Sequence, residues 1–117
     1  MLNRKILLLT VISGSLVLSG LSAMAAGKGD AKAGKKIFET NCATCHGLTG
    51  KGDGVASSAL NPKPRNFFEA KFKYGSDDAS LFKTISLGKG IMPPWKGILS
   101  DKQINDVIAH VRTLKKK

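Results

Sequence analysis

Apolar residues recur every three or four positions in three segments of this sequence, which is the spacing of one face of an α-helix. They are Ala33, Ile37 and Phe38 in the first segment, Leu81, Phe82 and Ile85 in the second, and Ile104, Val107, Ile108, Val111 and Leu114 in the third. No convincing run alternates apolar and polar side chains as a half-buried β-strand would. The pattern therefore predicts an all-α protein with three or more short helices.

Capping residues mark the expected ends of these helices. They are Asp30 and Gly47 for the first, Ser76 and Gly88 for the second, and Ser100, in a capping box with Gln103, for the start of the third. Between the first two helices, glycines and two prolines predict a long loop over residues 47–65, with one short helical turn at residues 56–60. A loop of that length is unusual in a small domain unless it wraps around something.

The N-terminal segment has a short basic start, a largely apolar run over residues 6–18 and then small residues. This order is typical of a secretory signal peptide. The triplet Ala23-Met24-Ala25 predicts cleavage after it, with cleavage after Ala26 as the alternative. We therefore expect a signal peptide at 1–25, one domain at 26–117, and export to the periplasm or an equivalent extracytoplasmic compartment. An uncleaved anchor is the other interpretation, but the apolar run is shorter than the ~20 residues that span a bilayer.

The composition is strongly basic. In 117 residues, 19 Lys and Arg against 8 Asp and Glu give a formal net charge of +11. Such a charge steers acidic partners toward the protein. Nucleic acid is not an expected partner, because the sequence has no zinc finger, RNA-binding signature or helix-turn-helix pattern. We expect a monomer, without stable membrane insertion after cleavage, that meets protein partners with acidic docking surfaces.

Two thiols and an imidazole fall within the five residues from Cys42 to His46. Cys-x-x-Cys followed by His is the attachment motif of c-type haem: each thiol forms a thioether with one vinyl group, and the imidazole can ligate the iron. Three alternatives use the same residues. A thioredoxin-like pair would need a βαβ pattern nearby, a disulfide between Cys42 and Cys45 closes too short a loop to stabilise much, and a zinc site would have to recruit the distant His110.

Met92 is the only methionine outside the predicted signal peptide, and it lies on a loop stiffened by glycines and by Pro93 and Pro94. Packing explains a methionine less well on such a loop than on a helix face. A thioether sulfur is a good sixth ligand for haem iron, and His/Met ligation raises the reduction potential. We therefore predict His46 as the proximal and Met92 as the distal axial ligand. His110 and a lysine are the rival distal ligands.

Together these residues resemble the class I c-type cytochromes over residues 30–114. The resemblance rests on Gly34-Lys35-Lys36-Ile37-Phe38, on Cys42 to His46, on Met92-Pro93-Pro94-Trp95 and on the final amphipathic helix. It implies a cytochrome c fold, in which short helices wrap around one covalently attached haem c. It also implies an electron-transfer protein of a respiratory chain rather than an enzyme.

The resemblance implies roles for further residues. A loop proline would offer its carbonyl to the second ring nitrogen of His46; Pro64 is favoured, with Pro62 as the alternative. Arg65 would pair with a haem propionate, or else stand solvated at the surface. Members of the family commonly carry an aromatic residue near position 110 that contacts the first helix. This chain has His110 instead, which we expect to be a surface or interface histidine.

The expected function is that of a soluble, exported one-electron carrier. A haem subunit held permanently in a larger oxidoreductase is the alternative, and a zinc- or disulfide-stabilised basic binding module is the third. Four lysines flank the expected haem loops and form the candidate docking surface: Lys51, Lys63, Lys89 and Lys96.

Overall fold

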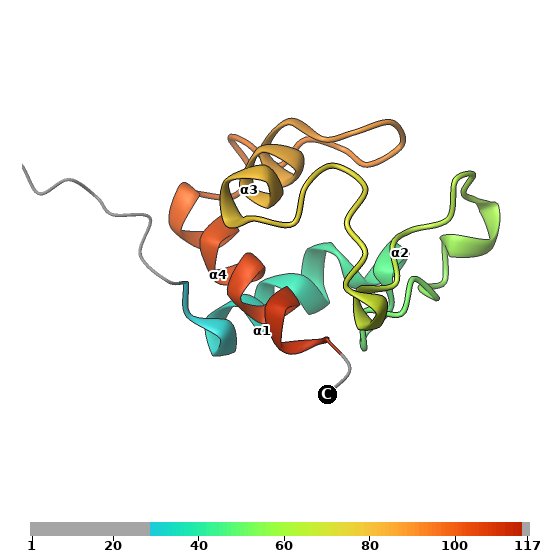
Figure 1. Ribbon diagram of the computed structural model, residues 1–117, viewed down its shortest axis with the longest axis horizontal. Helices are drawn as coiled ribbons and strands as arrows, with labels where there is room; N and C mark the ends of the chain where they lie inside the picture. The colour runs from blue at the N-terminus through green and yellow to red at the C-terminus, as the bar shows by residue number, and fades with distance from the viewer. Residues whose placement is uncertain (1–28, 116–117) are drawn as a thin grey trace, which may run out of the picture.

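The protein is described by a computed structural model over residues 29–115, and the regular structure of that part is helical (Figure 1). The α-helices run over Ala31–Asn41 (α1), Ala43–His46 (α2), Asp78–Leu87 (α3) and Asp101–Thr113 (α4). Short 3₁₀ turns lie at Ser57–Ala59 (η1), inside the turn predicted for residues 56–60, and at Phe67–Glu69 (η2).

The all-α prediction is confirmed: between residues 29 and 115 the chain forms two isolated bridges but no β-strand. No helix in the same range is long and apolar enough to cross a bilayer. The predicted signal peptide, residues 1–25, lies outside the described residues.

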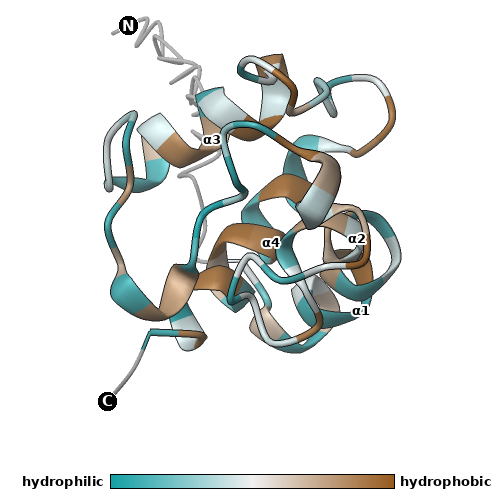
Figure 2. Ribbon diagram, turned by 90° about the vertical axis from the view of Figure 1, so that its right-hand side faces the viewer, coloured by the Kyte–Doolittle hydropathy of each residue, from teal (hydrophilic) through white to brown (hydrophobic). Residues whose placement is uncertain are grey.

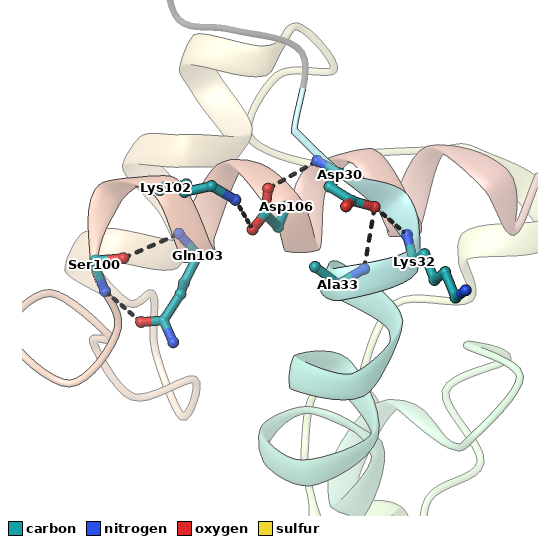
Figure 3. Close-up of polar contacts among 7 residues, drawn as sticks. All are labelled: Asp30, Lys32, Ala33, Ser100, Lys102, Gln103 and Asp106. Carbon is teal, nitrogen blue, oxygen red and sulfur yellow. Dashed lines mark hydrogen bonds and ion pairs between the residues drawn. The ribbon is translucent and has the colours of Figure 1, made fainter.

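The predicted caps of α1 and α4 are confirmed, and both are drawn in Figure 3. Asp30 Oδ1 accepts the backbone N–H groups of Lys32 at 2.8 Å and Ala33 at 3.2 Å. Ser100 Oγ accepts the N–H of Gln103 at 3.2 Å, and Gln103 Oε1 accepts the N–H of Ser100 at 2.8 Å. Local sequence therefore fixes where these two helices begin.

The start of α3 differs from the prediction by one residue, because Asp77 rather than Ser76 is the N-cap. The Asp77 carboxylate accepts both the N–H and the hydroxyl of Ser80, at 2.9 and 2.6 Å. Ser76 contributes its carbonyl instead, which accepts a hydrogen bond from Arg112 of α4. The same guanidinium binds Asp78 at 2.6 Å. The carboxylate of Asp77 thus caps the helix in place of the Ser76 hydroxyl.

α1 crosses α4 closely, and the apolar faces of the two helices meet there (Figures 1 and 2). Gly34 is buried at the crossing, where a Cβ would overlap the backbone carbonyl of Asp106. One cluster of buried side chains joins α1 to α4 and contains Phe38, Ala43, Val107 and Val111. A second joins α3 to α4 and contains Leu81, Leu99, Ile104 and Ile108. Gly34 and Phe38, two of the residues on which the resemblance rests, therefore bring α1 close against the last helix.

A buried carboxylate reinforces the crossing at its N-terminal end (Figure 3). Asp106 of α4 is 3% exposed and accepts the backbone N–H of Asp30 at 2.7 Å. Its second oxygen accepts Lys102 Nζ at 2.8 Å. Burial alone would raise the pKa of Asp106, but the hydrogen bonds from Lys102 and Asp30 and the lysine's charge together hold it below its ordinary value. The ionised carboxylate therefore ties the start of α1 to the middle of α4.

The expectation that His110 is a surface or interface residue is wrong. Its side chain is buried on α4, with the residue 6% exposed, and its ring lies 5.1 Å from that of Phe38. It therefore occupies the place where the resemblance implies an aromatic contact to the first helix. Its Nε2 is buried without a hydrogen-bond partner. Burial lowers the pKa of His110, while Glu39 raises it and Lys35 lowers it further.

Replacing His110 with phenylalanine is expected to stabilise the protein, because it removes a buried polar atom that has no partner, a defect that costs about 1–3 kcal/mol. The gain should grow below pH 6.5. There the unfolded chain, with an ordinary histidine pKa of about 6.5, binds a proton that the folded state resists. Wild-type stability is thus full above pH 6.5 and falls as the pH drops toward the lower folded pKa.

Denaturant unfolding of the wild type and His110→Phe at pH 7.5 and pH 5.5 measures both effects. A variant that is less stable at both pH values would show that the histidine makes a favourable contact in solution. A pH dependence unchanged from wild type would mean that His110 is not the group that titrates.

Candidate haem-binding site

The Cys42–His46 motif lies where α1 gives way to α2. The expected single helix is divided at Cys42, whose N–H still donates to the Phe38 carbonyl at 2.8 Å. The Cys42 carbonyl then accepts the N–H groups of Cys45 at 3.2 Å and His46 at 2.9 Å. Both thiols are free and half-buried. One turn of chain therefore brings together two unpaired thiols and an imidazole.

The Cys42 thiol is poorly suited to chemistry that needs a thiolate. Burial and, second, the neighbouring Cys45 raise the pKa of the Cys42 thiol to about 11. Reactive redox cysteines and zinc ligands depend instead on a stabilised thiolate. In the part of the chain that the structure describes, no three His, Cys, Asp or Glu side chains gather as a metal cluster, so His110 does not join the motif. The site thus favours thioether attachment over the thioredoxin-like and zinc alternatives.

The imidazole of His46 is held on two sides. Its Nδ1 lies 3.3 Å from the carbonyl oxygen of Arg65, and its ring stacks on that of Phe67 with the centroids 4.6 Å apart. Burial lowers the pKa of His46, and the Arg65 carbonyl opposes that shift. Because a carbonyl only accepts, Nδ1 carries the proton in the neutral ring and Nε2 keeps its lone pair. That is the tautomer a metal-binding histidine needs.

The acceptor is the carbonyl of Arg65, one residue beyond Pro64, the favoured prediction, and not that of Pro62. Phe67 explains the difference, because its N–H donates to the Gly50 carbonyl at 2.8 Å and fixes the chain just after Arg65. The Pro64 carbonyl packs against Gly52 instead, 2.5 Å from where a Cβ would lie. The Arg65 side chain is exposed, and its pairing with a propionate stays a prediction.

The predicted loop folds back onto the motif. Its backbone N–H groups satisfy the last carbonyls of α2: Gly52 donates to His46 at 2.8 Å and Gly54 to Cys45 at 3.1 Å. A Cβ on Gly54 would overlap the carbonyl of Thr44, so this approach requires glycine. The loop and η2, which carries Phe67, therefore fix the orientation of the motif without regular structure.

Met92 lies on a separate loop between α3 and α4, which extends on the same right-hand side of Figure 1 as α2. A tight turn holds it: Met92 N–H donates to the Lys89 carbonyl, and Lys89 N–H donates to the Met92 carbonyl, both at 3.0 Å. The loop is tied to α3 by Trp95 N–H on the Ile85 carbonyl at 3.0 Å. Met92 itself is half-buried, and its ligation stays a prediction.

The four predicted docking lysines are all exposed. Lys51 Nζ lies 5.2 Å from the ring centre of Phe68, and Lys89 Nζ lies 5.1 Å from that of Tyr74. Lys63 Nζ donates to the carbonyl of Ser57 at 3.1 Å and is less free than the others. Tyr74 could not be recognised from the sequence as a neighbour of one of these lysines, because the contact joins two separate loops.

The residues present fit a covalently attached haem. Two free thiols occupy one turn, and the adjacent imidazole carries its proton on Nδ1, which leaves Nε2 for the iron. The predicted second ligand, Met92, offers a soft thioether sulfur, a donor that cytochromes c use together with histidine. Fold and motif together define a class I c-type cytochrome, whose haem c is covalently bound.

The family to which the chain belongs is cytochrome c oxidase, cbb3-type, subunit III, which matches residues 29–111. The chain is 36% identical over 106 residues to the cbb3-type cytochrome c oxidase subunit FixP of Bradyrhizobium diazoefficiens, covering 89% of this chain and 34% of FixP. It thus spans about a third of the length of that relative. It is also 40% identical to cytochrome c6 of Limnospira maxima, covering 71% of this chain and 91% of that protein.

Two solved structures share the fold. Cytochrome c6 from the diatom Phaeodactylum tricornutum has a TM-score of 0.56 and 30% sequence identity, covering 73% of this chain and 93% of that chain. A chain of the Kuenenia stuttgartiensis reducing HAO-like protein complex has a TM-score of 0.69 and 32% identity, covering 75% of this chain and 44% of that chain. The predicted class I cytochrome c fold is confirmed.

Proposed function

We propose that the protein is an exported one-electron carrier. Its single haem c would be attached through Cys42 and Cys45 and ligated by His46 and Met92. The observation that carries this proposal is the turn that joins two free thiols to an imidazole whose Nδ1 faces the Arg65 carbonyl. When bound, haem c supplies the one-electron couple between ferric and ferrous iron.

The groups around the motif would hold the iron ligands in a fixed orientation during electron transfer. Phe67 stacks on the His46 ring and the Arg65 carbonyl fixes its rotation, so the imidazole reorganises little when the charge on the iron changes. The Lys89–Met92 turn would hold the thioether of Met92 in place. Ligation by both His46 and Met92 would favour electron transfer over catalysis on a bound substrate.

The absorption spectrum of the exported protein tests this proposal. A c-type pyridine haemochrome and the weak far-red band of ferric methionine–sulfur ligation are the expected results. A colourless protein from a host that matures haem would overturn it. A c-type haemochrome without the far-red band would leave the attachment site intact and remove Met92 from the iron.

A freely diffusing carrier and a complex subunit are both consistent with the relatives. The match to cytochrome c6 of Limnospira maxima spans 91% of that protein, which favours a carrier that functions alone. The matches to FixP and CcoP subunits, which this chain covers only in part, favour the alternative of a subunit bound in an oxidoreductase. Gel filtration of extract from the native cells separates them: a free carrier elutes as a monomer, a subunit with its complex.

We also propose that Lys51, Lys63, Lys89 and Lys96 form the surface that docks acidic redox partners. Charge steering of this kind changes association rates by about 10- to 1,000-fold and weakens with salt. Reversal of both Lys89 and Lys96 to glutamate is expected to slow electron exchange with an acidic redox protein at low salt by about 10-fold or more. Stopped-flow kinetics over a salt series measures this effect.

Lys32 and Lys36, which are exposed on α1, provide the matched control. Their double reversal changes the net charge equally but leaves the haem loops unaltered. Equal slowing in both double variants would show that net charge, rather than a docking surface, sets the rate. A wild-type rate that does not fall as salt is added would remove the docking proposal altogether.

A further inference from the structure

Gly88 stands where the chain leaves α3 and enters the loop that carries Met92. It caps the C-terminus of α3 with φ 70° and ψ 172°, a backbone conformation that is essentially restricted to glycine. This conformation turns the chain so that the loop doubles back over the end of the helix. Gly88 therefore determines the direction in which the Met92 loop starts.

Gly88 also lies against the backbone of the ligand segment itself. A Cβ at this position would be 2.5 Å from the carbonyl oxygen of Met92, 2.7 Å from the nitrogen of Pro94 and 2.8 Å from the carbonyl carbon of Pro93. All three are main-chain atoms, which cannot rotate away as the end of a flexible side chain can. Any side chain at residue 88 must therefore displace the stretch from Met92 to Pro94.

The backbone from Met92 to Pro94 is restrained on both sides. Met92 exchanges two backbone hydrogen bonds with Lys89, both 3.0 Å long. Pro93 and Pro94 have φ angles fixed by their rings. Beyond them, Trp95 N–H is bound to the Ile85 carbonyl of α3 at 3.0 Å. A side chain at residue 88 would therefore push against the backbone of Met92, which lies between its hydrogen bonds to Lys89 and the hydrogen bond of Trp95.

We propose that Gly88 is a positioning residue for the Met92 thioether: by lacking a side chain, it lets the Met92 carbonyl approach the end of α3 and so sets the reach of the sulfur. The inference rests on the proposed ligation by Met92. It extends that proposal from the ligand to the residue that places it. Substitution at residue 88 should weaken the iron–sulfur bond while leaving haem attachment at the distant thiols unchanged.

Gly90 and Gly97 offer matched controls on the same loop. Both have positive φ, 58° and 87°, a region that L side chains rarely adopt, so alanine is unfavourable at either position. Neither has any atom within 4 Å of the place where a Cβ would lie. Comparison of the three alanine variants therefore separates the contact with Met92 from the general cost of placing alanine at positive φ.

The experiment compares ferric holoproteins of the wild type, Gly88→Ala, Gly90→Ala and Gly97→Ala. Pyridine haemochrome gives haem content, the far-red band reports the methionine–iron bond, and thermal unfolding reports stability. We expect Gly88→Ala to keep its haem and lose most of the far-red band, and to bind added imidazole at least 10-fold more tightly than the wild type. The two controls should keep the band.

A Gly88→Ala holoprotein with the wild-type band and imidazole affinity would overturn the inference. Equal loss of the band in all three variants would overturn it too, because strain alone would then explain the effect. A wild type that lacks the band would instead overturn ligation by Met92, and the inference with it. The first two failures leave the proposed function standing, so the outcomes are distinguishable.

If Gly88→Ala yields no holoprotein, a second change keeps the test decisive. Combining it with Pro94→Ala frees the φ angle of residue 94 and lets the loop move away from the new side chain. The double variant is expected to recover haem and stability and still lack the far-red band. Recovery of the band as well would contradict a positioning role for Gly88.

Discussion

Replacing Cys42 and Cys45 together by serine is expected to give a protein that carries no covalent haem and does not unfold cooperatively. The reason lies in where the buried apolar side chains are. Between Ala43 and Leu81 the structure buries no hydrophobic side chain. Phe67 and Phe72 in that stretch are only half-buried. We therefore expect this stretch to depend on the haem for an apolar surface to cover.

The remaining core is small. Within residues 29–115 it consists of two clusters of four buried residues each, both built on α4. A domain of this size is marginal even with a complete core, and folded proteins are stable by only about 5–15 kcal/mol. Loss of the haem face should therefore leave α1 and α4 without enough contacts to hold the long loop.

Circular dichroism and thermal unfolding of the purified double variant test this expectation. Thr44→Ala is the matched control, because Thr44 lies in the same turn but its side chain is exposed. The control is expected to keep haem and unfold cooperatively. A double variant that melts in one sharp transition without haem would show that the protein core alone supports the fold.

Local chemistry explains how much of the fold could be predicted. The caps of α1 and α4 use side chains within three residues of the groups they bind, so the sequence determines them. The cap of α3 is local as well, because Asp77 binds Ser80 three residues on. The prediction was one residue too early because Ser76 and Asp77 are adjacent and both are residue types that cap helices.

In the site, too, contacts between neighbours in the chain could be predicted and contacts between distant segments could not. Cys42, Cys45 and His46 are neighbours in the chain, so their meeting in one turn could be predicted. The partner of the His46 ring could not, because it depends on how the loop returns to Gly50. His110 is expected from the sequence at the surface or in an interface, whereas the tertiary contact with Phe38 buries it. For both His46 and His110, the prediction was wrong because a segment distant in the sequence contacts the side chain.

Met92→Ala is expected to abolish the far-red band and to lower the reduction potential. Methionine raises the potential of cytochromes c relative to other ligands, and axial ligands spread haem potentials over about 0.8 V, so we expect a fall on the order of 0.1 V or more. The half-buried thioether contributes little to either buried cluster. Haem content and the fold should therefore survive, which separates a ligand from a packing residue.

The neighbouring Ile91 provides the control, because it lies in the same turn and is 51% exposed. Ile91→Ala removes a side chain of similar size without touching the predicted ligand, so its band and its potential should match those of the wild type. Redox titration with optical detection measures both quantities in one experiment. If Met92→Ala kept the wild-type potential, the sixth ligand would be another residue. A shift caused equally by Ile91→Ala would assign the effect to the shape of the turn, whereas a fall confined to Met92→Ala identifies the sulfur as the group that sets the potential.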